Sequence, residues 1–231
     1  MSDFNEFSPV SIDDIIYLNE STRFRISGYK KGLLNGNIIL FGTNGTGKTT
    51  LAHLLPEAIS GGKAIVENLT ISELLSRKDM SDYIARNASL ARLAKGKYYI
   101  ISDEFDKLAK NPTDLWLVLD KYSDYIMMII TTNELHNIHK SLRSRCELIE
   151  MPALKAIDFY PRADNILIAQ GITLPRAQLM TYLKKKEHAG DIRGYMRLVK
   201  ELIFLTQSNF PLPPWKPNIA SPPVLRVVSV P

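Results

Sequence analysis

The hydrophobic positions in the first two thirds of this chain fall into short continuous runs. Five runs are rich in Ile, Val and Tyr and contain no proline, which is typical of buried parallel strands. They are Asn37–Phe41, Lys63–Val66, Tyr98–Ser102, Tyr125–Thr131 and Cys146–Glu150. The segments between them have helix-like patterns. These segments predict helices over Lys48–Ser60, Thr70–Ser76, Met80–Lys95 and Pro112–Tyr122.

Strands and helices that alternate at this spacing predict an α/β fold with a parallel sheet between two helical layers. We therefore expect a three-layer αβα domain with a five-stranded parallel sheet over residues 1–152. In such sheets, ligands bind at the carboxyl ends of the strands.

The pattern changes after Met151-Pro152, where strand-like runs give way to three helix-like segments. These are Pro161–Gln170, Pro175–Glu187 and Asp191–Leu205. The first two open on a proline at the first helical position, and Asp191 suits the N-cap of the third. We expect a small helical domain over residues 153–208.

Residues 209–231 form a proline-rich tail that is a poor core former. An extended or disordered tail is the favoured interpretation. Trp215 and the run Val-Leu-Arg-Val-Val could instead dock on a partner as an extended peptide.

Composition narrows the class of protein without naming its function. The 231 residues are 45% hydrophobic and 23% charged, as in ordinary globular proteins, and a net charge of +5 suits a nucleic-acid partner without demanding one. The single cysteine, Cys146, excludes an internal disulfide and any multi-cysteine zinc site. Because we see no signal peptide and no apolar run of membrane-spanning length, we expect a cytoplasmic protein, or a viral protein that acts in the host interior, without a membrane partner.

A complete phosphate-binding motif lies between the first strand and the first helix. It reads Gly42, Thr43, Asn44, Gly45, Thr46, Gly47, Lys48 and Thr49, with Thr50 next in the helix. Glycines let the backbone wrap around phosphate oxygens, and the helix N-terminus attracts the anion. Lys48 would reach the β- and γ-phosphates and the Thr49 hydroxyl would hold Mg²⁺. The motif predicts a nucleoside-triphosphate site.

Polar residues at the ends of two later strands suggest hydrolysis. Asp103 and Glu104 follow the third strand candidate. Asp103 would bind in the Mg²⁺ shell, and Glu104 would orient and polarise the attacking water. Asn133, after the fourth strand, could position that water or the γ-phosphate. Solvated acids at a strand end and a turn-forming Asn are the alternatives.

Two arginines lie at positions where contact with a phosphate group would explain their presence. Arg145 precedes the fifth strand and could reach the γ-phosphate of an adjacent subunit as an arginine finger, although a solvated basic turn has the same pattern. Arg193 lies in the first turn of the last helix, where the helix dipole slightly disfavours a cation.

The order of these motifs resembles one family, the AAA+ ATPases of the clamp-loader type, which include replication factor C small subunits and their phage and bacterial relatives. The resemblance covers roughly residues 5–206. It rests on the phosphate loop, Asp103-Glu104, Thr131-Thr132-Asn133, Ser144-Arg145-Cys146 and Gly190-Asp191-Ile192-Arg193. The segment Phe7–Ile16 also looks like the adenine-side box of this family.

The resemblance implies roles for particular residues. Asn133 would be the sensor-1 residue, Arg145 the finger that acts in trans, and Arg193 the sensor-2 arginine that acts in cis. Asn68 would restrain Glu104 until DNA or a partner binds, while Arg143 lies outside the match. The preference for ATP over GTP rests on the resemblance as well.

The resemblance also implies a function in DNA replication together with other AAA+ subunits, DNA and a sliding clamp. Arg86, Arg92, Lys95 and Lys97 are a candidate DNA-facing set, which a solvated helix face explains equally well. Clamp-loader subunits normally continue into a helical collar domain, whereas a proline-rich tail follows the lid here. A helicase loader, a transposition or plasmid regulator, and a nucleotide-binding scaffold with little turnover are the alternatives.

Overall fold

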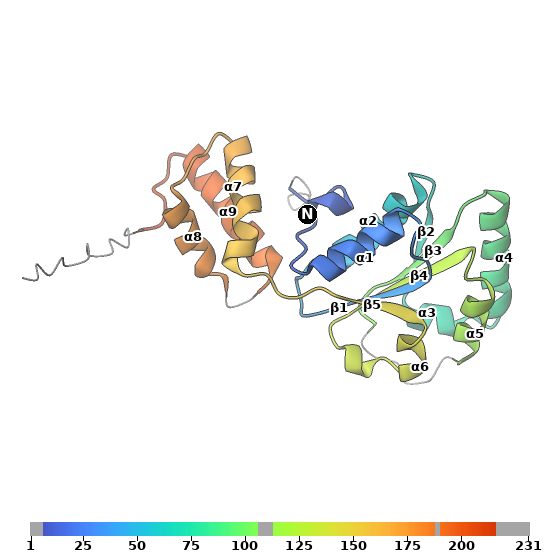
Figure 1. The fold of residues 1–231 in the computed structure, drawn as a ribbon. Helices are drawn as coiled ribbons and strands as arrows, with labels where there is room; N and C mark the ends of the chain where they lie inside the picture. Colours follow the sequence, from blue (N-terminus) through green and yellow to red (C-terminus); the bar gives the residue numbers. More distant parts are fainter. Residues whose placement is uncertain (1–6, 106–112, 188–189, 216–231) are drawn as a thin grey trace, which may run out of the picture.

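In the computed structural model, five strands form one parallel sheet in the order β2-β3-β4-β1-β5 (Figure 1). The structure describes residues 7–105, 113–187 and 190–215. The strands are β1 Asn37–Phe41, β2 Ile65–Asn68, β3 Tyr98–Ser102, β4 Ile126–Thr132 and β5 Cys146–Glu150. The predicted α/β fold with a five-stranded parallel sheet is therefore confirmed.

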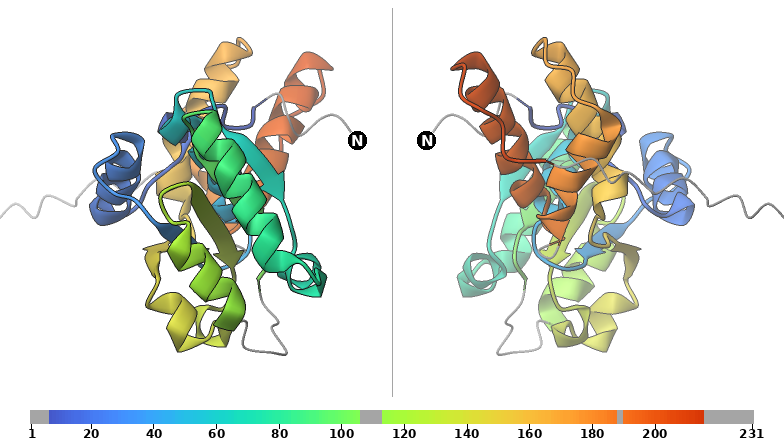
Figure 2. Two further views of the ribbon diagram at one scale, coloured as in Figure 1. Left: turned by 90° about the vertical axis from the view of Figure 1, so that its right-hand side faces the viewer. Right: turned by 90° about the vertical axis from the view of Figure 1, so that its left-hand side faces the viewer.

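Helices cover both faces of the sheet, which explains why its central strands are apolar throughout. Ile38 and Leu40 of β1 face one layer, whereas Ile39 between them faces the other. The first layer holds η1 Ile12–Asp14, α1 Glu20–Lys30 and α2 Lys48–Ser60. The second holds α3 Ile71–Ser76, α4 Met80–Leu93, α5 Thr113–Lys121 and α6 Lys140–Arg143, with η2 Leu135–Asn137 nearby (Figure 2).

Three further helices pack around a core of their own (Figure 1). They are α7 Ala156–Ala169, α8 Arg176–Lys184 and α9 Ile192–Gln207, called here the C-terminal helical unit. Phe159 and Tyr195 stack at its centre with ring centroids 5.0 Å apart. Within the described ranges, no helix combines the length and apolar character needed to cross a membrane.

Several predicted element boundaries differ from the structure. Helix α7 begins at Ala156, so Pro161 lies inside it rather than at its start. The earlier start is favoured because Ala156 and Phe159 are buried in the core of the helical unit and the Lys155 N–H bonds the Asp158 carboxylate at 2.9 Å. Strand β2 lies two residues later than predicted, and helix α1 was not predicted.

The described part of the proline-rich tail packs on the helical unit. The Tyr182 hydroxyl donates to the Pro213 carbonyl at 2.6 Å, and Leu212 and Trp215 lie against the core. This differs from the expected loose tail, because Trp215 finds an apolar surface in its own chain. The Val-Leu-Arg-Val-Val run lies outside the described residues.

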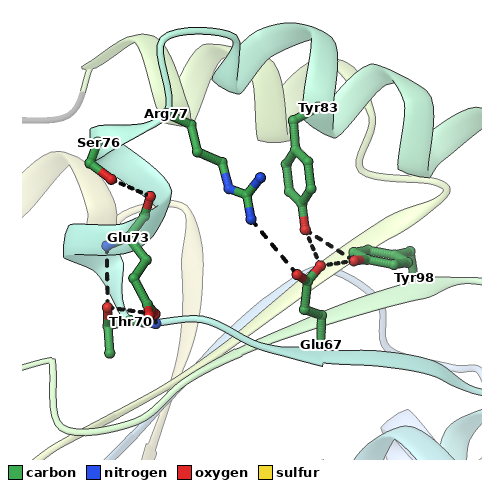
Figure 3. Close-up of polar contacts among 7 residues, drawn as sticks. All are labelled: Glu67, Thr70, Glu73, Ser76, Arg77, Tyr83 and Tyr98. Atoms are coloured by element: carbon green, nitrogen blue, oxygen red, sulfur yellow. Dashed lines mark hydrogen bonds and ion pairs between the residues drawn. The ribbon is translucent and has the colours of Figure 1, made fainter.

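Strand β2 is the edge of the sheet and is tied to α4 by a polar cluster (Figure 3). The Glu67 carboxylate accepts hydrogen bonds from the Tyr83 and Tyr98 hydroxyls, while Arg77 stacks over Tyr83 at 4.0 Å. Burial, and then the bond to Glu67, raise the pKa of both tyrosines, so both remain donors at neutral pH. The cluster holds the strand that ends at Asn68.

The packing of the sheet predicts an asymmetric response to truncation. Ile129 of β4 is fully buried, so Ile129→Ala should lower the free energy of unfolding by about 2–5 kcal/mol. Leu93 on α4 is 78% exposed, and Leu93→Ala should change it by less than about 0.5 kcal/mol. Urea denaturation measures both, and equal losses would contradict this description of the core.

Candidate active site

The phosphate loop joins β1 to α2 through backbone conformations that favour glycine. Gly42 has φ 148°, and a Cβ there would meet the Met151 carbonyl oxygen at 2.1 Å. Gly47 has φ 88° and is the N-cap of α2, so no side chain caps the first turn. The N–H groups of that turn are therefore available to an anion.

Gly45 is where the helical unit meets the loop. The Ile192 N–H donates to the Gly45 carbonyl at 2.9 Å. A Cβ on Gly45, whose φ is 71°, would lie 1.9 Å from Oδ1 of Asp191. Asp191 also caps α9 as predicted, because its Oδ1 accepts from the Arg193 N–H at 2.8 Å. A side chain at position 45 would displace the Asp191 carboxylate that caps the first turn of α9, where Arg193 lies.

Lys48 is buried against the loop that it belongs to. Its side chain is folded back, and its Nζ donates to the carbonyls of Gly42 at 2.8 Å and Thr43 at 2.6 Å. The residue is only 7% exposed. The ammonium is thus held against the backbone of the phosphate loop, where it adds a full positive charge.

The predicted metal residues lie in direct contact. Thr49 Oγ1 donates to the Asp103 carboxylate, at 2.9 Å from Oδ1 and 3.1 Å from Oδ2. Thr131 Oγ1 also bonds Oδ1 of Asp103. A hydroxyl and a carboxylate are the hard oxygen ligands that Mg²⁺ prefers, so this pair fits that ion.

Glu104 follows Asp103 in a conformation that is uncommon for a residue with a side chain. Its φ is 53°, in the left-handed region, and its N–H donates to Thr131 Oγ1 at 3.0 Å. Its side chain is exposed and lines the cleft. Such backbone strain is concentrated at functional sites, where the surrounding structure maintains it.

One cleft gathers most of the predicted site residues. It runs between the phosphate loop, the carboxyl ends of the strands and the helical unit. Its lining includes the predicted residues Asn44, Gly45, Thr46, Gly47, Lys48, Thr49, Thr50, Glu104, Asn133 and Arg193. Residues separated by up to 149 positions thus surround one space, with both lysine and arginine charge in its wall.

Arg145 lies elsewhere, outside the lining of this cleft. Its Nε donates to the Asp120 carboxylate at 2.8 Å, and its NH1 donates to the Ser141 carbonyl at 2.9 Å. Both partners of the ion pair are partly exposed. An arginine in this position cannot complete its own chain's cleft without moving, which is compatible with a role toward a neighbour.

The candidate DNA-facing residues have mixed surroundings. Arg86 pairs with Asp79 at 2.7 Å, and Lys97 donates to the Ser123 carbonyl at 3.3 Å. Burial lowers the pKa of Lys97, so that residue is a weaker candidate for contact with a polyanion.

The predicted restraint of Glu104 by Asn68 stays a prediction. Asn68 ends strand β2 and pairs with Ile101 of β3 in the sheet.

Apart from Arg193, the sequence did not predict the residues that the helical unit contributes to the cleft. Phe159, Arg162 and Met196 line it together with Ile192. Phe159 and Met196 have the spacing of ordinary core residues, so nothing in the sequence separates them from the rest of the apolar pattern. Arg162 was not predicted as a site residue, because the sequence pattern puts it in the first turn of a helix that begins at Pro161.

Comparison with known proteins identifies the domain. Residues 38–152 match the model of the ATPase family associated with various cellular activities (AAA). These residues therefore form a domain of the AAA ATPase family, which confirms the predicted fold class and the predicted family resemblance.

Individual relatives carry the resemblance further. The chain is 32% identical over 150 residues to the sliding-clamp-loader large subunit of Escherichia phage RB69. The matched region covers 63% of this chain and 45% of that protein. It is 24% identical over 230 residues to DNA polymerase III subunit gamma of Buchnera aphidicola subsp. Baizongia pistaciae, covering 88% of this chain and 60% of that protein. The predicted likeness to clamp loaders is confirmed, although the chain spans less than two thirds of these relatives.

A solved structure supports the fold alone. The Thermotoga maritima RuvB Holliday junction branch migration motor superposes with a TM-score of 0.64 at 20% identity, covering 88% of this chain and 68% of that one.

The contact at Gly45 predicts different effects for two glycines with similar backbones. Gly61 at the end of α2 has φ 64° but nothing within 4 Å of an added Cβ. Gly45→Ala should weaken binding of a fluorescent ATP analogue by at least about 10-fold, because backbone strain and the clash with Asp191 act together, whereas Gly61→Ala should stay within about 2-fold. Equal affinities for the two variants would contradict a functional contact between loop and helical unit.

Proposed function

We propose that this chain binds and hydrolyses ATP, and that the cleft is its active site. The observation that carries the proposal is the Thr49–Asp103 contact beside Lys48, with Glu104 and Asn133 in the wall of the same cleft. A site for binding alone would not need an exposed carboxylate held next to the phosphates by a strained backbone.

In this proposal the phosphate loop holds the triphosphate and Lys48 contacts its β- and γ-oxygens. Thr49 and Asp103 would hold Mg²⁺, which when bound neutralises charge that develops on those oxygens. Arg193 reaches the γ-phosphate from α9, which makes the helical unit a lid over the nucleotide.

Hydrolysis needs a water molecule in line with the γ-phosphate. Glu104 orients and polarises this water, and Asn133 holds it through its neutral donor and acceptor groups. The hydrogen bond from the Glu104 N–H to Thr131 fixes the backbone from which the carboxylate extends.

Arg145 acts on the γ-phosphate of an adjacent subunit. An exposed ion pair such as that with Asp120 contributes only about 0–1 kcal/mol, so it can be exchanged for a stronger bond to phosphate. Turnover then depends on assembly, either with copies of this chain or with related AAA+ subunits.

The favoured biological role is that of a clamp-loader-like ATPase in DNA replication inside the cell. The names of the phage and Buchnera relatives support this role, with DNA and a sliding clamp as partners. The net charge of +5 is compatible with DNA.

The proposed role of Glu104 predicts separation of binding from turnover. Glu104→Gln removes the carboxylate charge at nearly constant shape, so kcat should fall by at least about 100-fold while the Kd for ATP stays unchanged. Phosphate release and fluorescent-nucleotide titration measure the two. Turnover near the wild-type rate would show that Glu104 does not act on the water.

The proposed role of Arg145 predicts complementation between two inactive proteins. Arg145→Ala should retain ATP binding and lose most assembly-dependent hydrolysis, by about 10³- to 10⁵-fold if the finger is fully effective. Mixing it with Lys48→Ala should restore part of the turnover, because the second protein supplies fingers to sites that still bind ATP.

Arg143→Ala is the matched control, since Arg143 lies two positions away on α6 and outside the cleft lining. It should leave turnover within about 2-fold of wild type. Absence of rescue in mixtures that light scattering shows to co-assemble would contradict a finger that acts in trans.

A further inference from the structure

Arg162 of α7 bridges two parts of the chain that are distant in sequence. Its NH2 donates to the Phe7 carbonyl at 2.7 Å, and its NH1 donates to the Asp14 carbonyl at 3.0 Å. Both bonds are partly buried. One planar guanidinium thus holds both ends of residues 7–14, called here the N-terminal segment.

The N-terminal segment is also folded on itself. The Asp14 carboxylate accepts from the N–H groups of Val10 at 3.0 Å and Ser11 at 2.9 Å, which hold its pKa below the usual range. These hydrogen bonds close residues 10–14, and the bonds from Arg162 fasten the segment to α7 at Phe7 and Asp14.

The segment and Arg162 form one side of the nucleotide cleft. Phe7, Pro9 and Ile16 line it from the segment and its continuation, and Phe159 and Met196 line it from the helical unit. In Figure 1 the segment runs between that unit and the layer of α1 and α2. The phosphate loop occupies another part of the lining, so these five apolar side chains suit a flat base.

The guanidinium of Arg162 bonds carbonyls of the N-terminal segment, whereas Lys48 bonds carbonyls of the phosphate loop itself. The Asp14 carboxylate offers this guanidinium a favourable charge, yet the guanidinium donates its hydrogen bonds to two backbone carbonyls, which match a planar fork of donors and fix the position of that backbone. The same bonds tie the N-terminal segment to α7, so this wall is complete only when the helical unit is docked.

We infer that Arg162 is a positioning residue for recognition of the nucleotide base: it fixes the N-terminal segment as the base-side wall and links base binding to docking of the helical unit. The inference rests on the proposed function, since it presumes that the cleft takes ATP. It assigns Arg162 to the base and not to the phosphates.

The test compares ATP with inorganic tripolyphosphate, which has the phosphates and lacks the base, both with Mg²⁺. Calorimetric titration of Arg162→Ala should show ATP affinity reduced by about 10-fold or more and tripolyphosphate affinity within about 2-fold of wild type. The Michaelis constant for ATP should rise while kcat at saturation changes less.

Two further variants separate the role from a loss of folding. Arg162→Lys keeps the charge and most of the stem but not the planar fork, so it should restore little ATP affinity even if Arg162→Ala is unstable. Arg176→Ala is the control, because Arg176 stacks over Tyr160 at 5.1 Å on the same helical unit and lies outside the cleft lining. It should leave both affinities unchanged.

Each other outcome overturns the inference in a recognisable way. Equal weakening of ATP and tripolyphosphate would assign Arg162 to the phosphates, and unchanged affinities would leave it no role in the site. If wild-type protein binds tripolyphosphate as tightly as ATP, no base-side wall operates. If wild-type protein binds neither, the proposed function fails first and the inference with it.

Discussion

The contact between the phosphate loop and the start of α9 is the constraint on which the site depends. The two parts pack around separate cores, yet the Ile192 N–H bonds the Gly45 carbonyl and the Asp191 carboxylate occupies the space that a Cβ on Gly45 would need. Only glycine allows this approach in a left-handed backbone. The position of Arg193 relative to Lys48 follows from this contact, so the loop is both a phosphate cradle and a docking surface.

The parallel sheet supplies the other half of the site by a simple geometric rule. Strands β1, β3 and β4 are neighbours and all run the same way, so the residues after them meet at one edge. This brings Thr49 to Asp103, and Thr131 to both Asp103 and the backbone of Glu104. Hydrophobic packing of the strands therefore determines distances between polar groups that hydrolysis would require to within a fraction of an ångström.

Much of the sheet and of the phosphate-binding site could be predicted from the sequence, because their sequence patterns are local. The bounds of β1, β3, β5 and α2 match the prediction, since each run is bounded by a motif or by polar residues. Helix α1 was missed because its polar residues and Gly28 hide a weak apolar face. Arg162 and Asp120 were missed for a different reason. Arg162 bonds Asp14 across 148 positions and Asp120 bonds Arg145 across 25 positions, and no pattern in a single sequence reveals such contacts.

In the proposed mechanism, a neighbouring subunit completes a site that this chain builds only in part. Steady-state phosphate release per subunit, measured over a wide range of protein concentration with saturating ATP, tests it most directly. We expect turnover per subunit to rise with protein concentration and to level off where light scattering shows assembly to be complete. Turnover per subunit that stays constant from monomer to assembled protein would contradict it.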